Sequence, residues 1–267
     1  MQTIISLFIA LMLPLFAVLP QEREYPDWFL YPAKNPGIVT GFTYNKGRAV
    51  DHAAAVSCIY NGCILYGTVD FFNAENIDRA YKNSEYYYYY SEKCAGEYKK
   101  KLKPLQSLVL NVINMNRITA FTRDTAVKIS GNMIKESALA VPDWKDKIYY
   151  EEGGWLYGVG VYTSSGSDND AWITAEEKAV FTIVQNQMVK VSSYSETLNA
   201  GGKQKDHYQK IVRYTLAARL RKIEVVERFP DAGEKQYYVL VRVPAGGIKF
   251  LGDNFDMERG YKKHKMK

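Results

Sequence analysis

The chain is poor in the residues from which active sites are most often built. Its 267 residues include three histidines and three cysteines. Cys58, Cys63 and Cys94 are spaced unlike the ligands of a zinc site. No serine or cysteine stands in the glycine-flanked turn that exposes a nucleophile. We therefore expect no catalytic, cofactor-binding or metal-binding residue, and a protein that is not an enzyme.

The other candidates for chemistry have plainer explanations. His52 follows an aspartate, and adjacent residues of a helix do not face each other. Gly158 and Gly160 lie inside an apolar aromatic run, whereas a dinucleotide-binding fingerprint needs a third glycine at the start of a helix. Glycines within a strand indicate close packing instead. Glu176 and Glu177 are neighbours near a predicted helix start, where carboxylates complement the helix dipole rather than form an acid–base pair.

The chain also lacks an apolar run long enough to span a membrane as a helix. The longest apolar stretch, residues 4–19, is shorter than the roughly 20 residues that a spanning helix needs. Because charged residues follow it closely, we expect residues 1–20 to be an export signal, with an uncleaved N-terminal anchor as the alternative. In an oxidising compartment, three cysteines leave at least one without an intramolecular partner. We expect Cys58 and Cys63 to be small buried residues of a helix.

What the chain does contain is a pattern that occurs twice. A Pro-Asp-Trp motif stands at 26–28 and again at 142–144. Each motif is followed by a glycine-bearing aromatic run, at 37–44 and at 154–162. A polar loop and an alanine-rich amphipathic helix come next in both places. Self-similarity of this kind indicates two copies of one supersecondary unit.

Each copy is predicted to be an α+β layer, so the expected fold is two tandem repeats. Hydrophobic periodicity indicates a strand, an amphipathic helix and antiparallel strands, with one sheet face packed on the helix. In the first repeat, 21–140, we expect a strand at 38–44, a turn at 45–47, a helix at 48–69, a tyrosine-rich helical insertion at 73–103, a strand or strand pair at 107–121 and a closing segment at 125–134. In the second repeat, 141–244, we expect a strand at 155–162, a loop at 163–170, a helix at 171–194, a strand at 212–220 and a hairpin of 223–229 with 236–243. A basic tail without periodicity follows at 245–267.

Tyrosine is unusually abundant, with 22 residues. Five are consecutive and form the tyrosine run: Tyr86, Tyr87, Tyr88, Tyr89 and Tyr90. Five consecutive aromatic side chains cannot share one face of a helix or a strand. Since tyrosine is enriched in interface cores, the run is the candidate partner-binding patch. The alternative is a core-facing strand or an ordinary belt around a helix.

The net charge is modest, at +6, and does not by itself indicate a nucleic-acid partner. A lysine cluster at 99–103 and the basic tail carry much of the positive charge. We expect the cluster to be a solvated helix end and the tail a solvated, frayed terminus. An exported protein rarely meets nucleic acid, so none is expected as a partner.

The second repeat resembles a domain of the bacterial cell envelope. The resemblance is carried by the strand Trp155-Leu156-Tyr157-Gly158-Val159-Gly160, a Ser/Asp-rich loop, a helix with Ala171, Ala175 and Ala179, and the closing strand at 236–243. Over 142–244 the chain is similar to small outer-membrane lipoproteins and flagellar outer-membrane ring proteins (FlgP-like and FlgT-like). The resemblance implies an exported, non-catalytic structural protein that assembles at the envelope. The chain departs from the lipoprotein members in lacking a lipid-anchor cysteine.

These features together predict a non-catalytic envelope protein, periplasmic or associated with the outer membrane, that binds itself or other envelope proteins. Membrane contact is expected only through the N-terminal segment, if that segment stays uncleaved. The alternative function is a periplasmic module for a small ligand or a glycan, with a groove lined by aromatic residues: Trp28, Trp144, Trp155 and Trp172. An envelope hydrolase ranks third, because no sequence feature predicts a cleft with convergent titratable groups.

Overall fold

The computed structural model describes residues 22–43, 48–74, 77–111, 116–163, 166–197, 210–251 and 261–265. These residues form a mixed α+β structure with four α-helices and fourteen strands. The expected export signal at 1–20 and the expected turn at 45–47 lie outside the described residues. Within the described part, no helix combines the length and the apolar character needed to cross a bilayer.

The described strands form four sheets in which every paired strand is antiparallel to its neighbour. The five-stranded sheet has the order β13-β10-β3-β4-β14, with bounds Ile248–Phe250, Lys210–Arg221, Gly62–Ala74, Ile77–Ser91 and Tyr261–Lys265. The four-stranded sheet has the order β11-β12-β9-β8, with bounds Glu224–Asp231, Gln236–Pro244, Trp155–Thr163 and Tyr149–Glu152. The three-stranded sheet has the order β2-β6-β5, with bounds Ile38–Phe42, Asn116–Thr122 and Lys103–Asn111. The two-stranded sheet pairs β1, Glu24–Pro26, with β7, Met133–Lys135.

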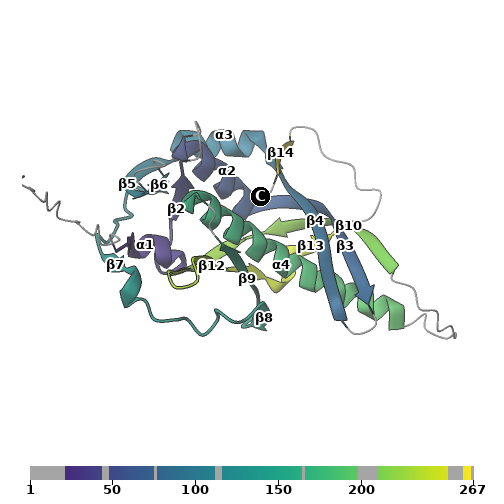
Figure 1. The fold of residues 1–267 in the computed structure, drawn as a ribbon. Helices are drawn as coiled ribbons and strands as arrows, with labels where there is room; N and C mark the ends of the chain where they lie inside the picture. The colour runs from purple at the N-terminus through teal and green to yellow at the C-terminus, as the bar shows by residue number, and fades with distance from the viewer. Residues whose placement is uncertain are drawn as a thin grey trace, which may run out of the picture.

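The two longest helices pack against faces of the sheets, and the core lies between them. The α-helices are α1 (Asp27–Leu30), α2 (Ala49–Asn61), α3 (Glu92–Lys101) and α4 (Asp168–Thr197), and the 3-10 helices are η1 (Pro32–Lys34), η2 (Glu136–Ala138) and η3 (Ala245–Gly247). Helix α4 packs on β9 and β12, and α2 packs on β2 and α3. Figure 1 shows α4 crossing the middle of the molecule, with its C-terminal half extending in the same direction as the long β3–β4 hairpin.

Strand glycines let the helices approach the sheets closely. A Cβ atom at Gly160 of β9 would lie 1.9 Å from the carbonyl oxygen of Ala175 in α4. A Cβ atom at Gly41 of β2 would lie 2.3 Å from the carbonyl oxygen of Ala49 in α2. No side chain fits at either distance, so both strands need glycine there. The prediction that the glycines of β9 serve close packing is confirmed.

One large core joins elements from both halves of the chain. The ring of Trp172 in α4 meets Phe29 of α1 edge-on, with centroids 5.3 Å apart, and meets Tyr237 of β12 at 4.8 Å. Phe181 of α4 stacks on Tyr86 of β4, with centroids 4.0 Å apart. Burial of large aromatic side chains supplies much of the stabilisation of such a core.

The first predicted helix is shorter than expected. Helix α2 ends at Asn61, where the expected helix continued to residue 69. Gly62 takes an extended conformation, and the residues after it pair with β10 along the whole of β3. Apolar residues recur every few positions in both a buried helix and a buried strand, so periodicity alone did not separate the two.

The tyrosine-rich segment is helical only in its last third. The expected helix at 73–103 is β4 up to Ser91 and helix α3 from Glu92. Pairing with β3 on one side and β14 on the other holds β4 as a strand, because cross-strand packing favours aromatic residues. The C-terminal residues also differ from the expected frayed end, since β13 and β14 add to the edges of the same sheet. For 107–121, where a strand or a strand pair was expected, the structure has the pair β5–β6. The predicted helix at 171–194 and the hairpin at 223–243 are confirmed as α4 and β11–β12.

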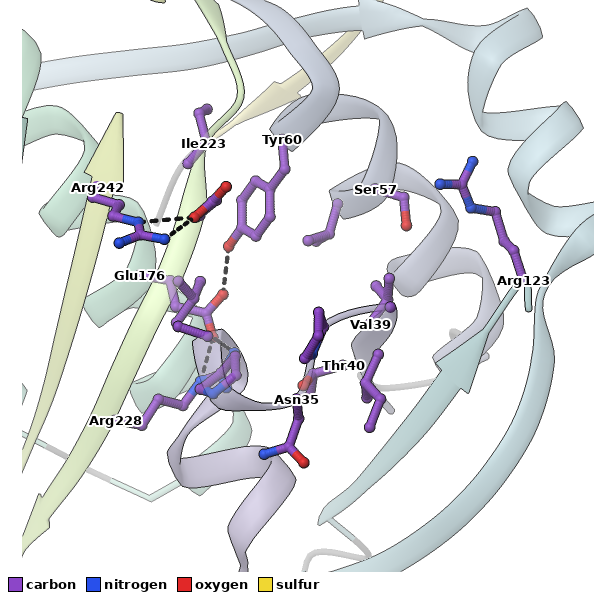
Figure 2. A pocket seen from close by; sticks show the side chains of 18 of the residues that line it. Asn35, Val39, Thr40, Ser57, Tyr60, Arg123, Glu176, Ile223, Arg228 and Arg242 are labelled. Carbon is purple, nitrogen blue, oxygen red and sulfur yellow. Dashed lines mark hydrogen bonds and ion pairs between the residues drawn. The ribbon is translucent and has the colours of Figure 1, made fainter. Parts of the chain in front are cut away.

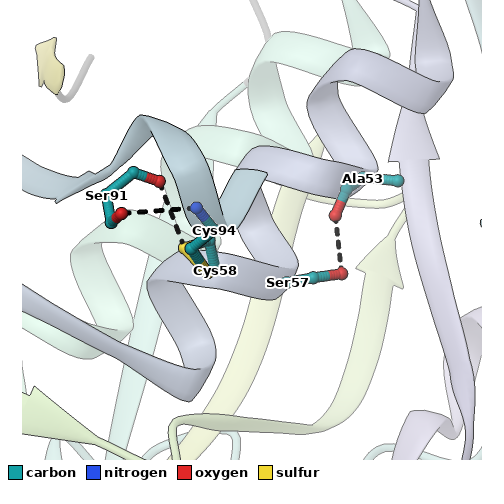
Figure 3. Close-up of a disulfide and its surroundings, with 5 residues drawn as sticks. All are labelled: Ala53, Ser57, Cys58, Ser91 and Cys94. Carbon is teal, nitrogen blue, oxygen red and sulfur yellow. Dashed lines mark hydrogen bonds between the residues drawn. A yellow bond between two sulfur atoms is a disulfide. The ribbon is translucent and has the colours of Figure 1, made fainter. Parts of the chain in front are cut away.

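A disulfide bond joins α2 to α3. Figure 3 shows Cys58 and Cys94 linked, with their Cα atoms 5.9 Å apart. The hydroxyl of Ser91 caps α3 by accepting a hydrogen bond from the amide of Cys94 at 3.3 Å. Cys63 is buried and carries a free thiol, whose pKa is raised by burial. The expected odd cysteine is therefore Cys63, whereas Cys58 is a disulfide partner and not merely a small core residue.

Candidate functional site

A pocket of about 530 Å³ lies between strands β2 and β11. Its walls come from η1, β2, α2, α3, α4, β11 and β12, so elements far apart in the sequence meet around it. Figure 2 labels ten of the side chains that define this β2–β11 pocket: Asn35, Val39, Thr40, Ser57, Tyr60, Arg123, Glu176, Ile223, Arg228 and Arg242. Its volume falls in the range of roughly 300–1,000 Å³ that is typical of ligand sites.

Two special backbone positions place the strands at the pocket. Gly37 has φ +84° and leads the chain into β2, and this left-handed conformation favours glycine. Lys222 has φ 57° and separates β10 from β11. The amide of Ile223 then donates to the carbonyl oxygen of Tyr60 at 2.8 Å, which fixes the start of β11 against the end of α2.

Both strands present an edge to the pocket rather than one face. Residues 36–40 line it consecutively, and so do residues 223–225. Successive side chains of a strand point to opposite faces, so a wall made of consecutive residues is a strand edge. β2 and β11 are end strands of their sheets, and no other described strand pairs with these edges.

A buried ion pair forms the floor of the pocket. The guanidinium of Arg228 donates to one carboxylate oxygen of Glu176 from Nε at 2.9 Å and from Nη2 at 2.7 Å. Its third nitrogen donates to the carbonyl oxygen of Phe29 at 2.6 Å. The side chains of Arg228 and Glu176 are only 3% and 7% exposed. Such a pair is held in one geometry because each buried charge depends on its partner.

Tyr60 completes this network. Its hydroxyl donates to the second carboxylate oxygen of Glu176 at 2.7 Å. Burial raises the pKa of Tyr60 well above its ordinary value, and the negative charge of Glu176 raises it further. The phenol therefore stays protonated and remains a donor. Figure 2 shows the three side chains joined on one side of the pocket.

The remaining charges lie nearer the surface. Arg242 pairs with Glu224 at 2.7 Å and lies over the ring of Trp155, with its guanidinium carbon 4.3 Å from the ring centroid. Arg123 lies over the ring of Tyr98 at 4.6 Å. Among the described residues, Arg123 makes no ion pair. The pocket thus carries nearly balanced charge, and most of its polar groups are already bonded to one another.

The tyrosine run is divided between the two faces of the five-stranded sheet. Tyr86, Tyr88 and Tyr90 are buried in the core and face the helices. Tyr87 and Tyr89 are half-buried on the outer face, where the amine of Lys263 lies 3.8 Å from the ring centroid of Tyr87. The run therefore cannot act as one patch. The partner-binding prediction stays a prediction for Tyr87 and Tyr89 alone.

The tryptophans do not form the expected groove. Trp28 and Trp172 are fully buried, and Trp144 is 7% exposed. Trp155 is half-buried beneath Arg242. None of the four lines the β2–β11 pocket. The tryptophan-lined glycan groove is therefore wrong, because these rings are used for packing.

Sequence reasoning missed the residues that form the site. Glu176 was expected to complement the dipole at the start of the helix. It lies instead in the third turn of α4, where its carboxylate binds Arg228 and Tyr60. These three residues lie far apart in the chain, so no local spacing connects them. The one available signal was the parity switch near Ile223 and Val225, because a bulge there changes which face of the predicted strand Arg228 lies on. A charged residue at a core-facing strand position needs a buried partner.

Comparisons with protein-family models, with curated proteins and with solved structures found no match to the chain. The resemblance to outer-membrane lipoproteins and flagellar ring proteins over 142–244 therefore stays a prediction.

Proposed function

We propose that the chain is an exported, non-catalytic envelope protein, built from two tandem copies of one α+β unit, that binds a partner protein at the interface between the copies. The observation that carries the binding function is the β2–β11 pocket. One wall comes from β2 in the first half of the chain, and the other comes from β11 in the second half. A pocket between two units is a common place for a binding site.

The order of elements supports two copies. The succession of β2, α2, β3, β5 and β6 in the first half corresponds to that of β9, α4, β10, β11 and β12 in the second. In each half, the second strand of the hairpin pairs with the first strand of the unit, as β6 with β2 and β12 with β9. The corresponding strands β3 and β10 pair with each other and run antiparallel, as a twofold relation between the copies requires.

The strand register supports the correspondence residue by residue. Each hairpin has a bulge at the same place: between Pro104 and Gln106 in β5, and between Val225 and Glu227 in β11. Gln106 pairs with Ala120, which pairs with Thr40. In the same way, Glu227 pairs with Leu240, which pairs with Val159. The register thus makes Thr40 the counterpart of Val159.

The two Pro-Asp-Trp motifs make the same contact. The indole of Trp28 donates from Nε1 to the side chain of Gln106 at 2.7 Å. The indole of Trp144 donates from Nε1 to the side chain of Glu227 at 3.0 Å. Both acceptors directly follow the bulge of their hairpin. This shared contact gives a physical reason why the motif occurs twice.

The disulfide supports export. Bonds such as Cys58–Cys94 persist in oxidising compartments and are rare where thiols are kept reduced. The N-terminal apolar stretch at 4–19 points the same way. Both observations support the proposed location in the periplasm or at the outer membrane.

The polar groups of the pocket favour binding over catalysis. The carboxylate of Glu176 is saturated by Arg228 and Tyr60, and that of Glu224 pairs with Arg242. A general base needs to reach a proton of its substrate, but these carboxylates are already engaged. A rigid, internally bonded pocket suits recognition.

The proposal is tested by expressing the full chain in a bacterial host and following both its location and its thiols. We expect a periplasmic product without its first residues, with one free thiol and an intact Cys58–Cys94 bond. A product that stays in the cytoplasm and needs no oxidation to fold contradicts the proposed compartment.

A small ligand is the second candidate for the pocket, because the volume of about 530 Å³ suits one. Self-association is the second candidate for the partner, because Tyr87 and Tyr89 lie on the outer sheet face. The molar mass of residues 21–267, measured by light scattering at several concentrations, distinguishes the two. A mass that rises with concentration indicates self-association, and a constant monomer mass indicates that the partner is another protein.

A further inference from the structure

We propose that the β2–β11 pocket takes an extended peptide segment of a partner protein, which pairs antiparallel with the free edge of β2. The inference rests on the proposed two-copy architecture and names the partner's chemistry. In the second copy, the edge of the corresponding strand is already paired. In the first copy, the same edge is the wall of the pocket.

The second copy shows what covers such an edge. β8 pairs with β9, with Tyr149 opposite Gly158 and Tyr150 opposite Tyr157. Just before β8, the carbonyl oxygen of Ile148 accepts a hydrogen bond from the amide of Val159 at 2.9 Å. The outer edge of β9 is thereby satisfied by a strand from its own copy.

The first copy leaves the corresponding donor open. The amide of Thr43 donates to the carbonyl oxygen of Arg117 in β6 at 2.9 Å. Amides alternate in direction along a strand of an antiparallel pair, so the amide of Thr40 points away from β6 and toward the free edge. Among the described residues, that amide has no hydrogen-bond partner, whereas its counterpart at Val159 has one.

The two neighbouring amides on this edge of β2 already donate hydrogen bonds, so the amide of Thr40 is the donor left for a ligand. The amide of Ile38 donates to the carbonyl oxygen of Asn35 at 3.4 Å. The amide of Phe42 donates to Nδ1 of His52 at 3.4 Å. An incoming strand that places a carbonyl oxygen at Thr40 would repeat the contact that Ile148 makes with Val159. Adding a strand to an exposed edge is a common mode of peptide recognition.

The walls indicate the composition of the peptide. Val56 of α2, Val39 of β2 and Val225 of β11 give the pocket apolar sides. Its buried arginine and the arginine of β12 are both paired with glutamates. The two other charged residues that line it, Arg123 and Asp124, carry opposite charges, so little net charge is left to select a charged ligand. Side chains of a strand alternate between faces, and pockets for alternate side chains provide specificity. The expected ligand is therefore an extended segment with apolar residues at alternate positions.

The probe is a phage-displayed library of random linear peptides, selected on the full exported chain. Selected peptides should carry apolar residues at alternate positions. Added at about 100 times Kd, they should slow hydrogen exchange at the amide of Thr40 by about 100-fold, because exchange then requires dissociation. Failure to select any peptide, or peptides that leave exchange at Thr40 unchanged, overturns the inference.

Two controls separate pocket binding from other effects. Val56→Arg places a charged side chain in the pocket and should abolish binding, whereas Asn61→Arg, on an exposed position of the same helix outside the pocket, should retain it. If Val56→Arg does not fold, peptides methylated on alternate backbone nitrogens replace it. One peptide is methylated on the odd-numbered nitrogens and another on the even-numbered ones. At least one of the two must fail to bind the unmodified protein, because alternate amides of a paired strand donate to its neighbour. Binding of both methylated peptides contradicts strand pairing.

The outcomes also separate this inference from the proposed function. If Thr40 is protected without peptide in a concentration-dependent dimer, a second copy is the occupant and the peptide inference is wrong. If unmodified protein and Val56→Arg are equally exported, oxidised and bound to a partner, the proposed function stands and the peptide inference fails.

Discussion

At the residue scale, alternation along β4 decides the role of each tyrosine in the run. Tyr86 and its alternate neighbours enter the core, and the two between them do not. Burial raises the pKa of Tyr86 to about 12, and the nearby carboxylate of Glu177 adds to the shift. The five consecutive tyrosines thus fall into two sets, one in the core and one on the outer face of the sheet.

These buried phenols predict a loss of stability in alkaline solution. A tyrosine in the unfolded chain ionises near its ordinary pKa of about 10, whereas Tyr86 in the folded protein ionises near 12. The folded state therefore holds more protons than the unfolded state between these values. Stability is fully present below about pH 10 and falls as the pH rises through 12. Urea midpoints measured on both sides of pH 10 should show this decrease.

Substitutions within the run supply the control for that measurement. Tyr86→Phe should reduce the alkaline loss, while Tyr87→Phe should leave it unchanged because Tyr87 lies on the outer face. An equal response of both variants would show that the buried phenol is not responsible.

The floor of the pocket predicts a large cost for breaking its ion pair. Glu176→Ala leaves the guanidinium of Arg228 buried without a carboxylate and should lower the free energy of unfolding by about 3–5 kcal/mol. Arg48→Ala removes a cation from the exposed Arg48–Asp51 pair and should cost less than about 1 kcal/mol. Urea denaturation measures both. Similar losses in the two variants would contradict the role assigned to Glu176.

The close approach of α4 to β9 predicts that Gly160→Ala is strongly destabilising. The new Cβ would lie 1.9 Å from the carbonyl oxygen of Ala175, so the helix must move away from the strand. Overpacking of this kind costs about 1–3 kcal/mol or more. Gly131→Ala is the matched control, since nothing lies within 4 Å of a Cβ at that position. Thermal unfolding should separate the two variants clearly.

At the element scale, the sequence predicts best those helices and strands that are marked by local signals. α4 and the β11–β12 hairpin follow from an apolar stripe and a turn signal, and both are confirmed. β3 and β4 were predicted to be helical because their identity depends on pairing with β10 and β14, which lie far along the chain. Apolar and aromatic periodicity did not carry that information. The ion pair of Glu176 with Arg228 was missed for the same reason.

The link between α2 and α3 predicts a clear effect of reduction. Cys58 and Cys94 are 36 residues apart in sequence, and closing a loop of that size restricts the unfolded chain. Reductant should lower the free energy of unfolding by about 2–4 kcal/mol. A Cys58→Ser/Cys94→Ser double variant should start at the lower stability and show no response to reductant. If reductant leaves the unmodified protein unaffected, the bond is not formed or does not constrain the chain.

At the scale of the whole molecule, the two halves are joined rather than merely adjacent. β3 of the first half pairs with β10 of the second along its length, and one core receives side chains from both. The repeated Pro-Asp-Trp motif at 26–28 and 142–144 led to the proposal of two copies. It did not predict the pairing across the halves, because a repeat in sequence says nothing about which surfaces of the copies meet.

The asymmetry between the halves matters for function. The second half carries β8 on the outer edge of β9, while the first half has η1 and a turn before β2. The proposed binding site is the edge of β2 in the first half, which no described strand covers as β8 covers β9 in the second half. Under the proposed two-copy architecture, this difference leaves the outer edge of β2 as a wall of the β2–β11 pocket, whereas β8 covers the outer edge of β9.

The most direct test of the account is site-specific photo-crosslinking in the cell that makes the protein. A crosslinking amino acid is placed at Val56, inside the pocket, and at Asn61, outside it on the same helix. The account predicts a covalent adduct with an envelope protein from position 56 and none from position 61. Adducts of the same kind from both positions, or from neither, would contradict the claim that the β2–β11 pocket is the binding site.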